Sequence, residues 1–227
     1  MAAARTTASA GGRAAAAGHS IARVTKRFDP SRIKCFVVGG DPGAAPPKSS
    51  GQSRPTEADG AAADLSAALV RRTLDWARDL TGADPDMIEL PQDFDRIESA
   101  PEEVVLLLRP ALVRFSPEQS RDVLDDLQSG CNVVVGPTLA GGWYLLALGG
   151  QARGLASSAG NGGPGSAGRL LGAARNIEGV EVGLLRAERD LNGDSDVEAA
   201  AADPLVDMEV VRLLAAVSTG GQGFEPR

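Results

Sequence analysis

Histidine and cysteine are scarce in this chain of 227 residues, and each shortage excludes a class of chemistry. The one histidine, His19, lies in an Ala-rich stretch near the start, so a Ser-His-Asp or Cys-His catalytic set is not expected. The two cysteines, Cys35 and Cys131, stand in or beside apolar runs and lack the spacing of a metal site. We therefore expect two buried thiols on neighbouring strands or strand edges, without a disulfide, in a reducing compartment.

An excess of positive charge and long apolar runs are also missing. The net charge of −7 argues against a sequence-independent grip on nucleic acid or on an anionic membrane. The longest apolar runs, VVLLL and YLLAL, are far too short to cross a bilayer. We expect a soluble, cytoplasmic protein whose partners are small molecules or proteins, with no nucleic acid and no membrane among them.

The first residues differ in composition from the rest of the chain. They are rich in Ala and Arg and contain no acidic residue before Asp29. An organelle transit peptide has this composition, but an Ala-rich disordered leader or a start codon placed too far upstream explains it equally well. We predict a disordered leader over residues 1–31, a single domain over 32–218 and a flexible tail over 219–227.

From residue 32 the pattern alternates between strands and helices. Short apolar, β-branched runs predict strands at 33–40, 103–108, 132–136, 143–148 and within 182–187. Apolar residues at helical spacing predict helices through 65–80 and over 205–217. A further helix has both ends marked, by Ser116 as N-cap with Pro117 and Gln119 behind it and by Gly130.

This alternation predicts an α/β domain with a mainly parallel sheet that helices cover on both faces. Ligands of such folds lie beyond the carboxyl ends of the strands. The loop after the first strand and the loop at 136–142 are expected at such ends. Both loops are therefore candidates for a binding site.

The second loop contains a glycine pair, Gly141 and Gly142, between two strand-like runs in VVVGPTLAGGWYLLAL. Glycine permits positive φ and the close approach of a ligand or another backbone. An ordinary hairpin connection would use the same pair, so both interpretations stay open. We predict a turn over which a ligand or the loop after the first strand approaches the sheet, with Trp143 starting the next strand and packing into the domain.

Four segments, in order, resemble the small bacterial glycosyltransferase-A-like family. CFVVGGDPGAAPPKSS resembles its first strand and Gly-Pro-Lys loop, and VVLLLRPALVRFSPE resembles its Gly-x-Asp-x-Pro strand end and Thr-Pro-Glu helix start. VVVGPTLAGGWYLLAL is similar to its Leu-Gly-Pro-x-x-Asp-Gly-Gly-Trp segment, the most specific match. VGLLRAERDLNGDSDVEAAAA resembles its closing strand, Arg-Asp-Val-Asp and helix. Order and spacing agree from about residue 33 to residue 203.

The resemblance implies a three-layer αβα sandwich with a mainly parallel mixed sheet, Rossmann-like and of the glycosyltransferase-A type. Relatives with this nucleotide-diphospho-sugar transferase fold transfer sugars from nucleotide sugars, or transfer nucleotides as the guanylyltransferases of cofactor biosynthesis do. The implied partners are a nucleotide or nucleotide sugar and a small-molecule acceptor. The residues that would bind the nucleotide are Gly39, Lys48, Gly136, Pro137, Gly141, Gly142 and Arg189.

Three carboxylates of the family are absent together. Arg109, Ala140 and Asn192 stand where the family has Asp residues. Magnesium and manganese prefer hard oxygen ligands, so the usual cation site cannot be assembled from these positions. Asp190 and Asp194 could supply a substitute pair of metal ligands, or they could be solvated turn residues.

Two minor motifs carry less weight. DLNGDSDVE at 190–198 has the oxygen spacing of a calcium loop, but Ser195 replaces the required Gly and Ala201 replaces the acid at position twelve. The GNGGPGSAG run at 160–168 lacks the Lys-Ser or Lys-Thr of a phosphate loop, and its composition predicts a flexible linker.

Two hypotheses of function follow from different classes. The first is a divergent glycosyl- or nucleotidyltransferase that acts on a nucleotide-activated donor and would use a divalent cation if active. The second is a non-catalytic relative that keeps the sheet as a nucleotide-binding or protein-interaction module. The resemblance favours the first hypothesis and the missing carboxylates favour the second, because a fold does not determine an activity.

Overall fold

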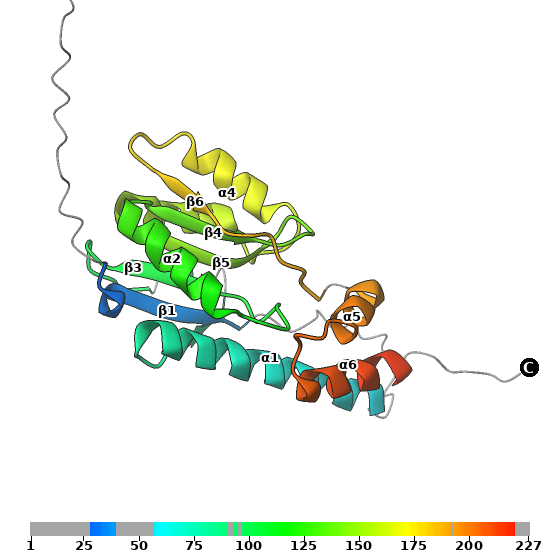
Figure 1. Cartoon of the computed structure of the whole chain (residues 1–227). Helices are drawn as coiled ribbons and strands as arrows, with labels where there is room; N and C mark the ends of the chain where they lie inside the picture. Colours follow the sequence, from blue (N-terminus) through cyan, green and yellow to red (C-terminus); the bar gives the residue numbers. More distant parts are fainter. Residues whose placement is uncertain (1–27, 40–56, 90–92, 95–96, 192, 221–227) are drawn as a thin grey trace, which may run out of the picture.

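A six-stranded sheet forms the centre of the molecule (Figure 1). The computed structural model describes residues 28–39, 57–89, 93–94, 97–191 and 193–220. The strand order is β2-β1-β3-β5-β4-β6. The strands are β1 (Ile33–Val38), β2 (Asp86–Ile88), β3 (Val104–Leu108), β4 (Val133–Pro137), β5 (Trp143–Gly149) and β6 (Val182–Leu184).

All strands except β5 run in one direction. β5 pairs antiparallel with both β3 and β4, whereas the pairs β1–β2, β1–β3 and β4–β6 are parallel. The short connection at 138–142 explains the reversal, since a few residues can join only antiparallel neighbours. The expected mainly parallel mixed sheet is confirmed, and the carboxyl ends of five strands meet at one edge.

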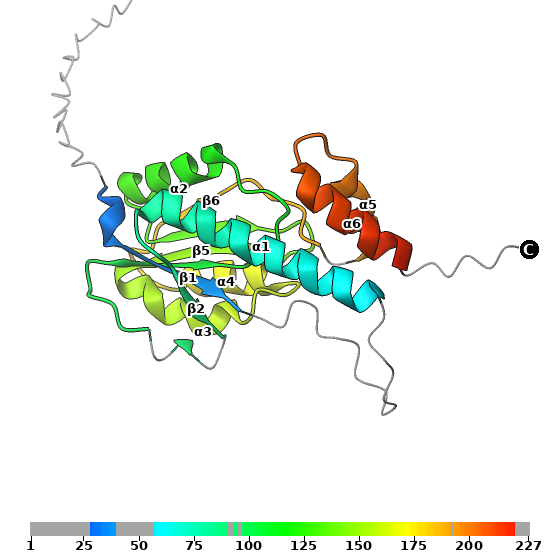
Figure 2. The ribbon, with the colours of Figure 1, turned by 90° about the horizontal axis from the view of Figure 1, so that it is seen from below.

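Helices cover both faces of this sheet (Figure 2). α1 and α2 lie on one face, and α3 and α4 lie on the other with the 3-10 helix at Gly150–Leu155. α5 and α6 pack against the first half of α1, beyond the carboxyl edge. The helices are α1 (Glu57–Thr81), α2 (Pro117–Ser129), α3 (Ala156–Ala159), α4 (Ser166–Ala174), α5 (Asp194–Ala201) and α6 (Met208–Gly220).

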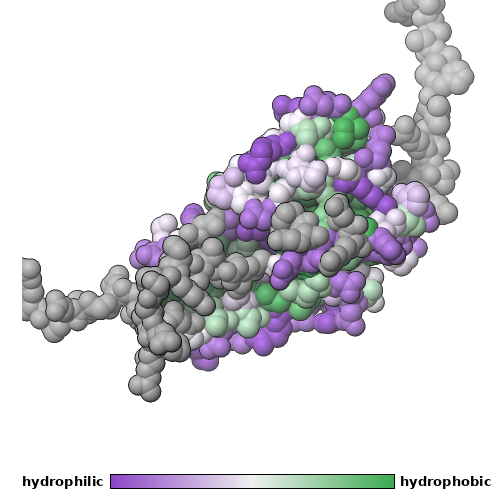
Figure 3. Space-filling view, turned by 180° about the vertical axis from the view of Figure 1, so that it is seen from behind, coloured by the Kyte–Doolittle hydropathy of each residue, from purple (hydrophilic) through white to green (hydrophobic). Residues whose placement is uncertain are grey.

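The apolar strands sort their side chains between the two layers. In β1, Cys35 and Val37 face the α1–α2 layer, while Phe36 and Val38 face the α3–α4 layer. Successive residues of a strand point to opposite faces, so a strand that is buried on both sides must be apolar throughout. The surface seen from behind is largely hydrophilic, with smaller hydrophobic areas between (Figure 3).

The helix with marked ends forms as predicted. Ser116 Oγ accepts a hydrogen bond from the Gln119 N–H (3.3 Å), and the Gln119 side chain accepts one from the Ser116 N–H (2.6 Å). Gly130 ends the helix in the left-handed region, with φ of 108°. This reciprocal cap satisfies N–H groups that have no partner within the first helical turn.

Other elements differ from the expectation or were not predicted. α1 begins at Glu57 and runs for 25 residues, further than the 65–80 stripe indicates, and the last helix is shifted to 208–220. Strand β2 and the segment from α3 to α4 had no predicted counterpart. Most of the predicted leader and tail lies outside the described residues. Within those residues, no helix combines the length and apolar character that a membrane span needs.

Both cysteines are free thiols, as expected, but their positions differ from the prediction. Cys35 is buried in β1, whereas Cys131 is only half-buried and precedes β4. β3 and β5 separate these two strands in the sheet, so the expectation of neighbouring strands is wrong. Burial raises the pKa of the Cys35 thiol to about 12.

The Cys35 pKa predicts a loss of stability at alkaline pH. The folded pKa lies above the ordinary thiol value of 9.0, so the stability that the buried thiol contributes is complete below pH 9 and falls as pH rises towards 12. The loss is at most about 1.4 kcal/mol per pH unit. Urea unfolding of the parent and of Cys35→Ala across this range should show a steeper decline for the parent. Parallel declines would contradict the prediction.

Gly136 in β4 provides a second test of the packing. A methyl carbon built on Gly136 would lie 2.5 Å from Cζ of Tyr144. Gly136→Ala should therefore lower the free energy of unfolding by about 1–3 kcal/mol. Gly168→Ala is the matched control, because this α4 glycine has no neighbour within 4 Å and alanine favours helix by up to about 1 kcal/mol. Equal effects in the two variants would refute the steric explanation.

Candidate functional site

The carboxyl edge of the sheet brings together residues from distant parts of the chain. Gly39 follows β1, Arg109 follows β3, and Thr138 follows β4. The Gly39 N–H donates to the Ile88 carbonyl (2.7 Å), which fixes this end of β1 beside β2. The segment after β6 continues along β4, where the Glu188 N–H donates to the Pro137 carbonyl (3.0 Å).

Arg109 places a cation at the end of the central strand β3. Its guanidinium donates to the carbonyl oxygens of Trp143 (3.0 Å) and Gly162 (2.7 Å). Burial lowers the pKa of Arg109, and the negative charge of Asp190 opposes that shift. An arginine stays protonated in proteins, so Arg109 brings a permanent positive charge to this edge.

Asp190 is the acidic residue of this edge whose negative charge acts on Arg109. Asp190 is buried, with only 5% of the residue exposed to solvent. Sequence reasoning noted Arg109 only as a missing carboxylate. Its proximity to Asp190 could not be read from the chain, in which the two residues are 81 positions apart (190 minus 109).

The described residues do not fit a resident magnesium or manganese ion. Arg109 would repel a divalent cation beside Asp190, and no group of three or more His, Cys, Asp or Glu side chains gathers anywhere in the described part of the chain. Asp194 is exposed in the first turn of α5. The binding of a metal ion by Asp190 and Asp194 stays a prediction. No third acidic side chain joins these two among the described residues.

The glycine pair forms a tight turn that Thr138 closes. The Thr138 N–H donates to the Gly142 carbonyl (2.9 Å), and Thr138 Oγ1 accepts from the Gly142 N–H (3.0 Å). Gly141 has a φ of 80°, a backbone conformation that residues with a side chain rarely adopt. Pro137 is half-buried just before this turn.

A segment of the same chain, at Gly162–Ala167, lies over this turn. The Gly162 carbonyl accepts from the Trp143 N–H (3.2 Å), and the Ala167 N–H donates to the Gly141 carbonyl (3.2 Å). A methyl group on Gly142 would overlap the Gly162 carbonyl oxygen. The run at 160–168, which we expected to be a flexible linker, is therefore fixed by hydrogen bonds and ends inside α4.

Trp143 begins β5 and is fully buried, as predicted. Its Nε1 donates to the Ala159 carbonyl (3.0 Å), so the ring also anchors the end of α3. Tyr144 points to the opposite face and lies over Gly136, which explains the lack of a side chain at that position. Burial raises the pKa of Tyr144.

Tyr144 and Gln119 form a buried polar pair that sequence reasoning missed. Gln119 Nε2 donates to the Tyr144 hydroxyl (3.3 Å), which donates to the Arg186 carbonyl (3.2 Å). The pair ties the start of α2 to the segment after β6. Gln119 was identified only as a helix cap, and no periodicity reveals its second contact.

The remaining predicted nucleotide-binding residues are dispersed. Lys48 lies outside the described residues. Arg189 forms an ion pair with Asp196 of α5 (2.9 Å), and its side chain is 48% exposed. The structure thus places Gly141 and Gly142 in one turn, with Pro137 at the end of the strand before it and with Gly39 and Arg189 after other strands of the same edge.

Of three comparisons with known proteins, the one with solved structures supports the fold. No family model matches the chain, and no curated protein matches it at a significant level. Among solved structures, it is similar to a "putative nucleotide-diphospho-sugar transferase" from Desulfovibrio desulfuricans, with a TM-score of 0.55 and 15% sequence identity. The match covers 83% of this chain and 97% of the other. The chain therefore has the Rossmann-like fold of a nucleotide-diphospho-sugar transferase.

The contacts of Arg109 predict a strong effect of its removal. Arg109→Met should lower the free energy of unfolding by about 2–4 kcal/mol, because two carbonyl oxygens lose a donor and Asp190 loses its nearby cation. Arg186→Met is the control, since that side chain is 84% exposed and should change stability by less than about 0.5 kcal/mol. Denaturant unfolding measures both; equal stabilities would count against the structural role of Arg109.

Proposed function

We propose that this protein binds a nucleotide sugar at the carboxyl edge of its sheet and transfers the sugar to a small acceptor, so that the nucleoside diphosphate leaves. The observation that carries the proposal is the Arg109 cation at the end of β3. In diphosphate chemistry, positive charge must neutralise the phosphates as the leaving group departs. Arg109 supplies charge where the resembled family has a carboxylate for a metal ion.

The proposal gives the surrounding residues distinct roles. Lys48, in the loop after β1, would contact the phosphates as a point charge, and Arg189 would add a second cation at this edge. The turn at Gly141 and Gly142 would set the floor of the donor site, as in the resembled family. Binding would then need no divalent cation, since the described residues do not fit one.

The second candidate is a non-catalytic module that keeps the fold. The observation in its favour is the segment at Gly162–Ala167, which lies against the turn where the resembled family lines its donor pocket. In this case the same edge would bind a nucleotide without turnover, or would bind a protein. The relation to cofactor guanylyltransferases would change the first candidate to guanylyl transfer, in which a guanosine triphosphate donates its monophosphate group to the acceptor and pyrophosphate leaves.

Calorimetry of the full chain with nucleoside diphosphates and nucleotide sugars tests the first proposal. Each titration is run with magnesium, with manganese and with EDTA, and the affinity is expected to be the same in all three. Lys48→Ala should weaken binding by about 1–3 kcal/mol, because a charged hydrogen-bond donor to phosphate is lost. Lys26→Ala is the matched control and should bind as the parent does.

The outcomes separate the candidates. Release of a free nucleoside diphosphate from a bound nucleotide sugar in the presence of small acceptors supports the transferase. Binding without release supports the non-catalytic module. Affinity that appears only with magnesium or manganese would show that the proposed metal-independent site is wrong.

A further inference from the structure

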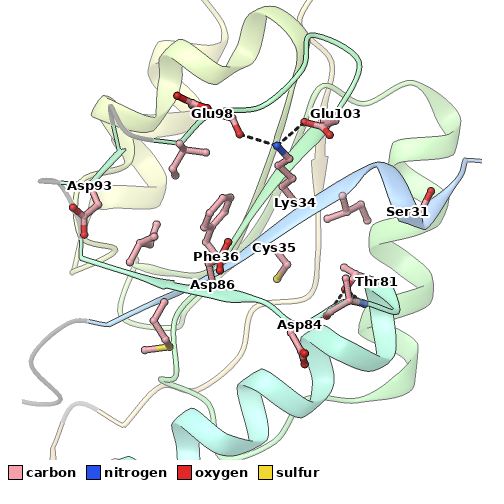
Figure 4. Close-up of a pocket in the computed structure, with 15 residues that line it drawn as sticks. Ser31, Lys34, Cys35, Phe36, Thr81, Asp84, Asp86, Asp93, Glu98 and Glu103 are labelled. Carbon is pink, nitrogen blue, oxygen red and sulfur yellow. Dashed lines mark hydrogen bonds and ion pairs between the residues drawn. The ribbon is translucent and has the colours of Figure 1, made fainter.

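A groove of about 570 Å³ runs along the free side of β1, away from the carboxyl edge described above (Figure 4). Its walls come from the start of β1, the end of α1 with the turn that follows, β2, and four residues after β2, namely Asp93, Ile97, Glu98 and Glu103. Phe36, Ile97 and Ile88 give it an apolar lining. The groove is separate from the proposed transferase site, so an inference from the groove does not rest on the proposed function.

The sheet leaves backbone groups unpaired along this groove. β2 pairs only with Phe36–Val38, so no strand of the described chain covers the same side of β1 at residues 33–35. β2 begins at Asp86, which lies opposite Phe36, so the pairing does not extend to the first half of β1. An open strand edge is a template for pairing with another chain.

The register identifies the two groups concerned. Along a strand in a parallel sheet, the backbone groups of successive residues point in turn to the strand on one side and to the strand on the other. The Gly39 N–H donates to the Ile88 carbonyl, which lies on the β2 side. The odd-numbered residues of β1 therefore direct their backbone groups to that side. Ile33 uses its N–H within the preceding turn, bonded to the Pro30 carbonyl. The Ile33 carbonyl and the Cys35 N–H are left facing the groove.

The charge around the groove is strongly negative. Its lining includes the carboxylates of Asp84, Asp86, Asp93, Glu98 and Glu103 and only one amine, that of Lys34. Lys34 is neutralised in place, because Nζ donates to the Glu98 carbonyl (2.9 Å) and lies 3.3 Å from a Glu103 carboxylate oxygen.

Two of these carboxylates are available to a cation. Asp84 forms an ion pair with Arg78, whereas among the described residues the carboxylates of Asp86 and Glu98 have no ion-pair or hydrogen-bond partner. The groove therefore disfavours anions such as nucleotides and attracts cationic side chains.

We propose that this groove binds an extended, basic peptide segment of a partner protein, which adds a strand to the free side of β1. Its backbone pairs with the Ile33 carbonyl and the Cys35 N–H, and its Lys or Arg side chains approach Asp86 and Glu98. Apolar side chains between them pack on Phe36 and Ile97. Backbone pairing provides the geometry and the carboxylates provide the selectivity for positive charge.

Fluorescence anisotropy with the full chain tests the charge requirement. The probe is a labelled peptide of seven residues that alternates Lys and Val, and the control peptide alternates Glu and Val. The Lys peptide should bind, its affinity should fall as salt rises, and the Glu peptide should not bind. Equal binding of both peptides would overturn the proposal.

A pair of double variants locates the binding to the groove. Asp86→Asn with Glu98→Gln should weaken binding of the Lys peptide about tenfold. Asp122→Asn with Asp125→Asn removes the same charge from exposed positions of α2 and should leave the affinity unchanged. Melting temperatures verify that all proteins are folded. Equal losses in the two variants would show non-specific charge attraction and overturn the proposal.

Hydrogen exchange measured by NMR tests the strand addition itself. On binding, exchange of the Cys35 N–H should slow at least tenfold, while the Phe36 N–H, which faces β3, should not change. No slowing at Cys35 would exclude strand addition. Binding that appears only after deletion of residues 1–27, which carry basic residues and no acidic ones, would mean that the chain covers its own groove and that the proposed partner is wrong.

Discussion

The carbonyl oxygen of Gly162 holds the carboxyl edge of this sheet together. It accepts hydrogen bonds from the Trp143 N–H at the start of β5 and from the Arg109 guanidinium at the end of β3. The absence of a side chain at Gly142 is what lets this carbonyl approach. One acceptor thus joins two strands and the connection between α3 and α4, and a buried carbonyl without these donors would be costly.

This arrangement changes the chemistry that the edge can support. The charge at the end of β3 comes from a side chain that is hydrogen-bonded to the protein's own backbone. Such a cation is fixed in position and, unlike a bound metal ion, cannot dissociate into solvent. Its charge is partly balanced by Asp190, which leaves less positive potential for an anionic ligand than an unpaired arginine would give.

Local signals in the sequence predicted the elements whose determinants are local. The helix over Pro117–Ser129 has its cap, its first proline and its final glycine within the chain itself, and the central strands are recognisable as apolar runs. β2 was missed because it has three residues, of which Asp86 and Met87 are exposed, so no alternation is visible. α4 was missed because its glycines disfavour helix, and burial of residues such as Leu170 against the sheet overrides that preference.

The candidate site was less predictable than the fold. The turn at Gly141 and Gly142 was located from its flanking strands, but the identity of what approaches it depends on residues some twenty positions later. Arg109 could be noted as a departure from a family pattern, but its bonds span 34 and 53 positions. Contacts of this length arise from the closed fold, and no periodicity in the chain encodes them.

The reversed direction of β5 also affects how the chain can assemble its sheet. β4 and β5 pair across the five-residue connection 138–142, whereas the pairing of β1 with β3 joins Ile33 to Val104, 71 positions away (104 minus 33). The entropy of loop closure grows with the length of the loop, and contacts between distant residues slow folding. The hairpin is the least costly place for pairing to begin, so the glycines that close it influence the rate at which the sheet forms.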